Sequence, residues 1–200
     1  MIFVLSSTTQ ITNYYYRLMK KLIIISLCFI YGLGQASAQV GDIFPVLEAE
    51  TVEDKVITLP QDAKGKFTLV GLAYSKKSEK DLSTWLIPLY NTFIYRPEKP
   101  SLFSAFAYDI NVYLVPMFTG VKAAATGTAK KQAAENLDPK LQSNLLFYKG
   151  SINAYKDSLS FDKKDVPYFF LLDESGKIVY ATSGAYSEQK MDDIEDQIVK

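Results

Sequence analysis

The stretch that decides the fold runs from residue 67 to residue 85 and reads FTLVGLAYSKKSEKDLSTW. Its opening part, Phe67 to Tyr74, is almost all apolar, which is typical of a central strand buried on both faces. Ser78 and Asp81 then have the spacing of a capping box, which marks the start of a helix. Apolar residues recur after this cap at helical spacing, at Leu82, Trp85, Leu86, Leu89 and Phe93. A strand that leads straight into an amphipathic helix is typical of an α/β domain, although Pro88 should kink this helix because proline lacks an amide hydrogen.

The segments around this unit add further strands and helices. Residues 46–59 indicate short strands around a polar turn, and Ile110 to Phe118 is a second β-rich run. Pro116 indicates that this second run ends at a sheet edge or already in a loop. Residues 122–137 have good helix propensity, apart from Gly127, which is unfavourable inside a helix, and an Asp-Pro pair follows them.

The last part of the chain predicts a hairpin followed by a helix. Tyr168 to Leu172 and Ile178 to Thr182 have the composition of two strands, and residues 173–177 between them form a turn. Ser187 is placed to cap a final helix. In that helix Met191, Ile194 and Ile198 share one face, and the acidic residues between them are expected to face solvent.

Three features of this sequence resemble the thioredoxin-like superfamily, particularly its peroxiredoxin-like and membrane-anchored thiol reductase branches. They are the entry Gly41 to Pro45 with Leu59-Pro60 and Gly65-Lys66, the step from Leu69 to Trp85, and the stretch Asp165 to Ile178. The resemblance implies an α/β thioredoxin-like fold, with a central mixed sheet flanked by helices and an insertion roughly between residues 94 and 108. It also implies a cis peptide bond at Pro167, in a Val-Pro loop ahead of the C-terminal hairpin.

The redox motif of that family is missing from this chain. In the family, a Cys-x-x-Cys motif lies between the strand and the helix, and matching Leu69-Val70 to the family's strand puts Lys77 and Lys80 where the cysteines lie. Cys28 is the only cysteine in the sequence. Thiol-disulfide oxidoreductases and peroxidases need an attacking thiolate, so the resemblance implies the fold without that activity and without a cofactor.

A narrower resemblance is to the cysteine-free thioredoxin-like chaperones that assist the assembly of mitochondrial ATP synthase. It is carried by the step from Ala73-Tyr74-Ser75 to Trp85-Leu86-Ile87-Pro88, and later by Leu171-Leu172-Asp173 and Gly176-Lys177-Ile178. This resemblance implies a protein that binds a subunit of a membrane complex.

The N-terminal residues have the pattern of a secretory signal peptide. Lys20 and Lys21 precede a short apolar run, Leu22 to Leu33, and the small-residue triplet Ala36-Ser37-Ala38 follows it. The run is shorter than the roughly 20 residues that a membrane-spanning helix needs. The pattern therefore predicts export, to the periplasm or beyond the cell, with an uncleaved membrane anchor as the alternative.

This signal also predicts the domain organisation. We expect translation to start at Met19 and cleavage to follow Ala38, which removes Cys28 and leaves residues 39–200 as a single thioredoxin-like domain without a stable membrane span.

Composition excludes several functions for this domain. The sequence has 22 basic and 22 acidic residues, and three of the basic ones precede residue 39, so residues 39–200 carry a net charge of −3. Such a mildly acidic chain is a poor candidate for binding nucleic acid through its phosphates. The sequence contains no histidine, which removes the usual base of nucleophilic triads and the commonest transition-metal ligand. No metal site is indicated.

The remaining candidate is a groove beside the Val-Pro loop that holds a protein or peptide partner. Thioredoxin-like proteins hold extended peptides there through backbone hydrogen bonds, and that mode needs no cysteine. The lysines at the start of the predicted helix also suit an anion, or simply a solvated helix end. Trp85 at helical spacing favours the core over such a groove. The expected site residues are Tyr74, Ser75, Lys76, Lys77, Ser78, Val166, Pro167 and Tyr168.

Two other functions stay open at the level of sequence. The first is a hydrolytic or metal-dependent enzyme that uses carboxylates, for which Asp42, Glu48, Glu50, Asp165 and Asp173 are available without a recognisable spacing. The second is a structural subunit of an envelope complex.

Overall fold

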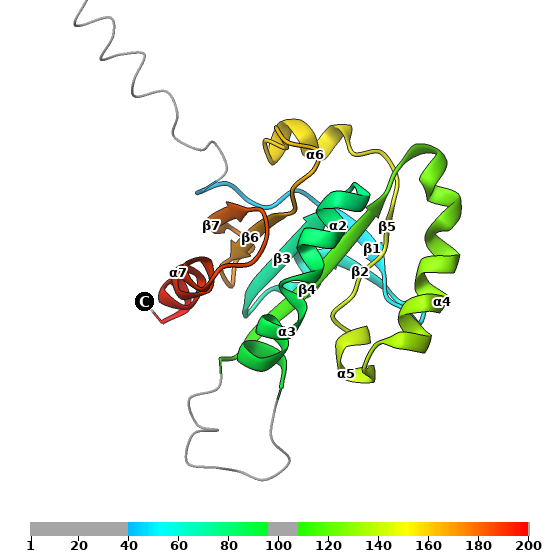
Figure 1. Cartoon of the computed structure of the whole chain (residues 1–200). Helices are drawn as coiled ribbons and strands as arrows, with labels where there is room; N and C mark the ends of the chain where they lie inside the picture. The colour runs from blue at the N-terminus through cyan, green and yellow to red at the C-terminus, as the bar shows by residue number, and fades with distance from the viewer. Residues whose placement is uncertain (1–39, 96–107, 200) are drawn as a thin grey trace, which may run out of the picture. The chain divides into compact units, whose positions relative to one another are not determined.

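A five-stranded mixed sheet forms the centre of the structure, a computed structural model that describes residues 40–95 and 108–199 (Figure 1). The predicted signal peptide lies outside these residues, as does most of the predicted insertion. The strand order is β5-β4-β3-β6-β7, in which β3 runs parallel to β4 and antiparallel to β6. The strands are β3 (Phe67–Ala73), β4 (Ile110–Phe118), β5 (Tyr148–Lys149), β6 (Tyr168–Leu172) and β7 (Ile178–Ser183). This arrangement confirms the predicted α/β class and central mixed sheet.

Alternate residues of β3 pack into two separate cores, one on each face of the sheet. Leu69 and Ala73 are fully buried against three helices, α2 (Lys76–Ser83), α3 (Leu86–Leu89) and α7 (Glu188–Ile198). Val70 and Leu72 are fully buried on the other face, in a core that also includes residues of β1 (Leu47–Glu50), β2 (Val56–Leu59) and α6 (Asn153–Ser158). Because both faces of β3 are covered, its run of apolar residues is explained.

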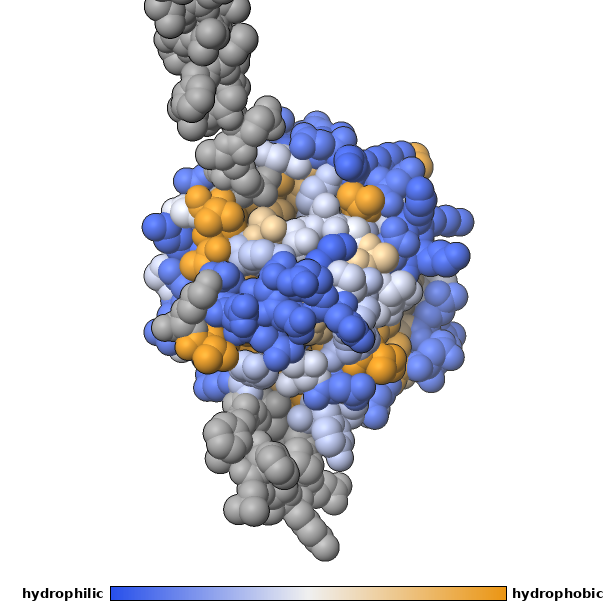
Figure 2. All heavy atoms as spheres, turned by 60° about the vertical axis from the view of Figure 1, so that its left-hand side comes forward, coloured by the Kyte–Doolittle hydropathy of each residue, from blue (hydrophilic) through white to orange (hydrophobic). Residues whose placement is uncertain are grey.

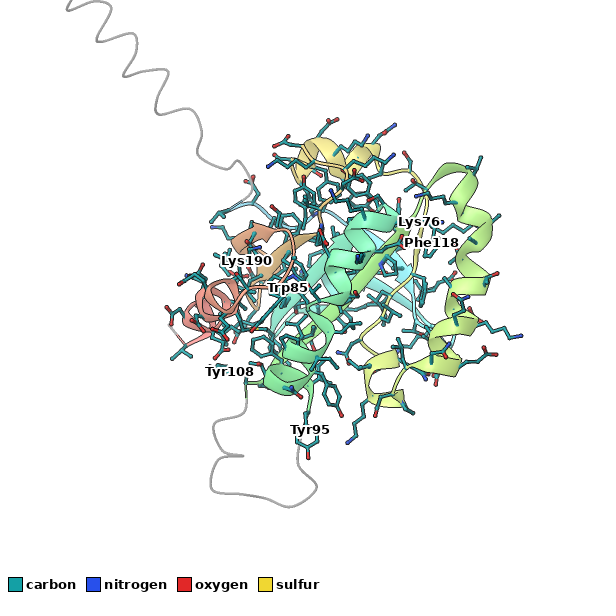
Figure 3. The ribbon with its side chains drawn as sticks, in the orientation of Figure 1. Lys76, Trp85, Tyr95, Tyr108, Phe118 and Lys190 are labelled. Atoms are coloured by element: carbon teal, nitrogen blue, oxygen red, sulfur yellow. The ribbon has the colours of Figure 1, made fainter. Side chains whose placement is uncertain are left out.

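Trp85 anchors the helical side of the sheet. It is fully buried, its ring lies 4.1 Å from that of Phe169, and its Nε1 donates a hydrogen bond of 3.1 Å to the carbonyl of Gly184 (Figure 3). The predicted place of Trp85 in the core is confirmed.

The helix predicted after β3 is divided into three parts. α2 ends at Ser83, α3 begins at Leu86, and a wider π-helical segment, Tyr90–Ile94, follows α3. Pro88 lies inside α3, and the break precedes it at Thr84 and Trp85, where Pro88 has no amide hydrogen to donate to the carbonyl of Thr84. The predicted disruption of the helix is therefore present as a break one turn before Pro88.

Strand β4 spans Ile110–Phe118, the β-rich run expected from the sequence, and it continues through Pro116, where the sequence indicated an end at a sheet edge or already in a loop. The amide of Leu114 donates to the carbonyl of Asn144 on the β5 side of the strand. Pro116, two residues further along, has its nitrogen on the same side, where β5 contributes only Tyr148 and Lys149. The missing amide hydrogen therefore faces the weakly paired edge and does not interrupt the ladder with β3.

The remaining elements follow the sequence closely. The helix predicted over residues 122–137 is a 3₁₀ turn, Gly120–Ala125, followed by α4 (Thr126–Asn136), and Asp138 then caps the short α5 (Pro139–Gln142). Ser187 caps α7, which buries Met191 and Ile194.

Figure 2 turns the side of the molecule that carries α7 forward and shows a largely hydrophilic surface with separate hydrophobic spots. Within residues 40–95 and 108–199, no helix combines the length and apolarity needed to cross a membrane.

Candidate functional site

Two serines close the turn between β3 and α2. Ser75 is the N-cap of α2, and its Oγ accepts a hydrogen bond of 3.0 Å from the amide of Ser78. In return, the Oγ of Ser78 accepts a hydrogen bond of 2.8 Å from the amide of Ser75. The two hydroxyl oxygens are 3.1 Å apart, and both side chains are buried. These reciprocal bonds form a capping box that fixes the first turn of α2.

The capping box predicted at Ser78 and Asp81 is wrong by one turn. Ser75 has an extended backbone (φ −137°, ψ 159°), so the helix begins directly after it and Ser78 is already the third helical residue. Lys76 and Lys77 are exposed in that first turn, and Lys80 is exposed in the next. The pair with Cys-x-x-Cys spacing at the end of the strand is therefore Ser75 and Ser78, two residues before the pair expected from the sequence.

A hydrogen bond joins this turn to the loop before β6. The hydroxyl of Ser75 donates to the carboxylate of Asp165 over 3.0 Å. The structure thus brings the two groups of predicted site residues together, those of the strand–helix turn and those of the Val-Pro loop. Asp165, which the sequence offers only as one of several carboxylates, supplies the link.

The cis bond predicted at Pro167 is not present. In the described residues the cis peptide bond is Leu59–Pro60, and Val166–Pro167 is not cis. The two isomers of an X–Pro bond differ by only about 0.5 to 1 kcal/mol, so the surrounding structure decides between them and a sequence pattern does not. Pro167 is buried, and its carbonyl accepts a hydrogen bond of 2.9 Å from the amide of Gly184.

Phe161 connects two of the predicted tyrosines and was missed by the sequence analysis. Its ring stacks on Tyr74 at 5.5 Å and on Tyr168 at 4.7 Å. The hydroxyl of Tyr168 is fixed in turn by the backbone of Lys163, whose amide donates to it over 2.7 Å. Burial, and then the neighbouring Tyr168, Asp165 and Asp162, raise the pKa of Tyr74, so its hydroxyl is neutral at physiological pH. The three stacked rings form one continuous aromatic wall.

A pocket of about 490 Å³, here called the lysine-rimmed pocket, lies along this wall. Tyr74, Phe161 and Ile152 give it apolar surface, and Thr119 to Lys122 close the side next to the end of β4. Its charged lining residues are Lys122, Lys156, Lys164 and Asp162, which makes it net positive. The pocket lies at the carboxyl ends of the parallel strands β3 and β4, where open α/β sheets usually bind their ligands. Of the eight predicted site residues, only Tyr74 lines it.

A second pocket, of about 220 Å³ and mostly apolar, lies between α2 and α4. Leu82, Leu86, Pro116 and Phe118 are among its lining residues, and we call it the apolar pocket. Glu79 is a polar residue in its lining. Burial raises the pKa of Glu79, and Lys122 and Lys76 oppose this rise. Phe118, the last residue of β4, lines the apolar pocket, and Thr119, the next residue, lines the lysine-rimmed pocket, so the two pockets meet at the end of β4.

The carboxylates considered for an enzyme do not converge. Glu50 is paired with Lys130, Asp165 accepts from Ser75, and Asp173 accepts hydrogen bonds within its own hairpin turn. Within residues 40–95 and 108–199, no three His, Cys, Asp or Glu residues are grouped so that they could hold a metal ion.

The comparisons with known proteins concern the fold. No family model matches the chain, and no curated protein matches it in sequence. Among solved structures, the C-terminal domain of a protein described as a thiol-disulfide oxidoreductase from Bacteroides thetaiotaomicron matches at 21% identity with a TM-score of 0.51, covering 82% of this chain and 98% of that one.

Two further structures match similarly. A thiol:disulfide interchange protein from Bacteroides sp. is 17% identical with a TM-score of 0.52 and covers 82% of this chain and 93% of its own. A protein described as the thiol:disulfide interchange protein DsbE from Chlorobium tepidum is 17% identical with a TM-score of 0.50, covering 80% and 96%. These similarities, together with the observed sheet order, show that this chain has a thioredoxin-like fold.

Proposed function

We propose that this protein is an exported, redox-inactive binding or chaperone-type module that holds a protein or peptide partner in the lysine-rimmed pocket. The observation that carries the proposal is the hydrogen-bonded pair Ser75 and Ser78 at the turn between β3 and α2, beside that pocket. In the thioredoxin-like proteins that this chain resembles, the redox cysteines lie at this turn. A serine hydroxyl cannot form the thiolate that disulfide exchange requires.

The charges and shape of the site indicate the partner's chemistry. Lys122, Lys156 and Lys164 outnumber Asp162 around the pocket, which favours an acidic segment. The apolar pocket on the other side of the β4 end suits a bulky apolar side chain of the same segment. An extended peptide with acidic residues and one apolar anchor therefore matches both hollows. Export is supported by the signal-like pattern of residues 1–38.

Photo-crosslinking tests the proposal. Val121 lines the lysine-rimmed pocket and is 96% exposed, so a photoreactive amino acid placed there should crosslink to acidic peptides that carry an aromatic residue. Val199, which is 72% exposed and follows α7 as its C-cap, serves as the control position. Lys164→Glu should weaken crosslinking at position 121 about tenfold, whereas Lys149→Glu on β5 should leave it unchanged. Equal crosslinking at positions 121 and 199, or turnover of a disulfide substrate by the purified protein, would refute the proposal.

A further inference from the structure

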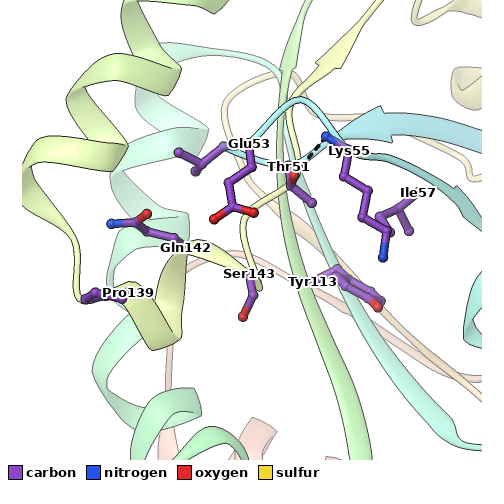
Figure 4. A pocket seen from close by; sticks show the side chains of 9 residues that line it. Thr51, Glu53, Lys55, Ile57, Tyr113, Pro139, Gln142 and Ser143 are labelled. Carbon is purple, nitrogen blue, oxygen red and sulfur yellow. Dashed lines mark hydrogen bonds between the residues drawn. The ribbon is translucent and has the colours of Figure 1, made fainter.

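A third pocket, of about 370 Å³, lies on the opposite side of β4 from α2 and is formed by three separate segments (Figure 4). The turn between β1 and β2 contributes Glu53 and Lys55, β4 contributes Tyr113, and α5 contributes Gln142 at its end. We call it the turn pocket. Its volume is within the range of small-molecule sites.

The β1–β2 turn is held rigidly by its own hydrogen bonds. The amide of Thr51 donates to the carbonyl of Lys55 over 2.9 Å, and the amide of Lys55 donates to the Oγ1 of Thr51 over 3.1 Å, which Figure 4 marks with a dashed line. From α4, Lys130 binds the carboxylates of Glu50, the last residue of β1, and of Asp54, which lies within the turn. The side chains on this turn are therefore presented from a fixed backbone.

The turn also carries one acidic and one basic side chain that Lys130 does not bind. Among the described residues, the carboxylate of Glu53 and the ammonium of Lys55 take part in no hydrogen bond or ion pair, either with each other or with other groups, and both line the turn pocket. Figure 4 shows Glu53 on the side of Gln142 and Ser143, and Lys55 on the side of Ile57 and Tyr113. The two charges thus lie on different sides of one hollow.

Tyr113 adds a neutral hydrogen-bond donor on the Lys55 side. Within the described residues its hydroxyl has no hydrogen-bond partner, and its ring is half-buried in the pocket lining. Burial, and then Asp62, raise the pKa of Tyr113, so the hydroxyl is protonated at neutral pH and able to donate. A carboxylate placed there would meet both an ammonium and a hydroxyl donor.

We propose that the turn pocket binds a small zwitterion of the α-amino acid class, with its ammonium at Glu53 and its carboxylate at Lys55 and Tyr113. The apolar lining residues Val52, Ile57 and Pro139 accept an aliphatic side chain. An α-amino acid matches both unpaired charges, whereas a simple anion or cation matches only one. This site is separate from the lysine-rimmed pocket and does not depend on the function proposed for it.

Calorimetric titration of the full chain with three related probes tests this site. L-Leucine carries both charges, 4-methylpentanoate lacks the ammonium, and 3-methylbutylamine lacks the carboxylate. L-Leucine should bind at least about tenfold more tightly than either analogue, because each lost charge-assisted hydrogen bond is worth at least about a tenfold change in affinity. Equal affinity for all three probes, or no binding of L-leucine, would overturn the proposal.

Variants assign each charge to one end of the ligand. Glu53→Gln should weaken the binding of L-leucine about tenfold and leave the affinity for 4-methylpentanoate unchanged. Lys55→Met should likewise weaken the binding of L-leucine about tenfold, and it should leave the affinity for 3-methylbutylamine unchanged. Glu48→Gln on β1 and Lys149→Met on β5 are the matched controls and should change no affinity. If Glu53→Gln weakened all three probes equally, the loss would reflect a distorted turn and the assignment would be wrong.

Discussion

The hydroxyl of Ser75 lies 3.0 Å from a carboxylate oxygen of Asp165, although the two residues are 90 positions apart in the sequence. This single hydrogen bond joins the start of α2 to the loop that enters β6. Because the same hydroxyl also accepts from the amide of Ser78, Ser75 organises both the helix cap and the contact between the two halves of the candidate site.

The first prediction concerns the energy of this contact. Ser75→Ala should lower the free energy of unfolding by about 1 to 2 kcal/mol, since it removes an N-cap together with a charge-assisted hydrogen bond. Urea denaturation of Ser75→Ala, Asp165→Ala and the double variant should give a coupling energy of about 1 kcal/mol. Asp157→Ala, an exposed carboxylate on α6, is the control. Strict additivity of the two single changes would show that the contact contributes nothing.

The second prediction uses the spacing of the two serines. In a Cys28→Ala background, Ser75→Cys with Ser78→Cys should form an intramolecular disulfide in air, because the two hydroxyl oxygens are already 3.1 Å apart. Lys77→Cys with Lys80→Cys has the same sequence spacing but lies on the exposed face of α2, and it should keep both thiols free. Titration of free thiols and intact mass distinguish the two results. A disulfide in the Lys77→Cys, Lys80→Cys pair alone would contradict the prediction and would place the Cys-x-x-Cys positions at Lys77 and Lys80, as expected from the sequence.

The sequence predicts the regular elements of this fold well, and the reason is local. The limits of β6 and the positions of β4 and α7 follow from apolar periodicity and from turn residues that act within a few positions. The cap of α2 is harder to predict from the sequence, because Ser75 and Ser78 are both good N-cap residues and only the backbone conformation at Ser75 selects between them.

The candidate site is only partly predictable for a different reason. Phe161 lies in a segment with no clear periodicity, and its place between Tyr74 and Tyr168 is set by packing against residues far away in the sequence. The isomer of the bond before Pro167 is likewise decided by tertiary structure. Both features need three-dimensional information that no spacing in the sequence contains.

The third prediction concerns the ion pairs that hold the β1–β2 turn to α4. Burial by itself lowers the pKa of Lys130, but hydrogen bonds to Asp54 and Glu50 outweigh it and raise that pKa. Lys130→Met should lower the free energy of unfolding by about 1 to 2 kcal/mol, because two carboxylates lose a largely buried partner. The neighbouring Lys131→Met removes only an exposed pair with Glu135 at 3.9 Å and should change stability by less than about 0.5 kcal/mol.

Salt dependence adds a second measurement to this comparison. The Lys130 side chain is 11% exposed and that of Lys131 is 76% exposed. Added sodium chloride should therefore reduce the stability effect of Lys131→Met by a larger fraction than it reduces that of Lys130→Met. Equal destabilisation by the two variants in thermal melts would mean that the Lys130 pairs behave as ordinary surface pairs.

The last prediction concerns stability in alkaline solution and rests on Tyr155. Its hydroxyl donates a hydrogen bond of 2.9 Å to the carbonyl of Val46, and burial, followed by the neighbouring Tyr148, raises its pKa to about 12. A tyrosine becomes charged when it loses its proton, and an unfolded tyrosine does so near pH 10. The folded state therefore holds this proton more tightly, so the contribution of Tyr155 is fully present below about pH 10 and is lost as the pH rises towards 12.

Tyr155→Phe should lower the free energy of unfolding by about 1 kcal/mol at pH 7, and this deficit should shrink or reverse in urea titrations above about pH 10. Tyr90→Phe, which removes a hydroxyl with no hydrogen bond among the described residues, is the control and should leave the pH dependence unchanged. A deficit for Tyr155→Phe that stays constant from pH 7 to about 11.5 would show that Tyr155 titrates at the same pH in the folded and unfolded chain.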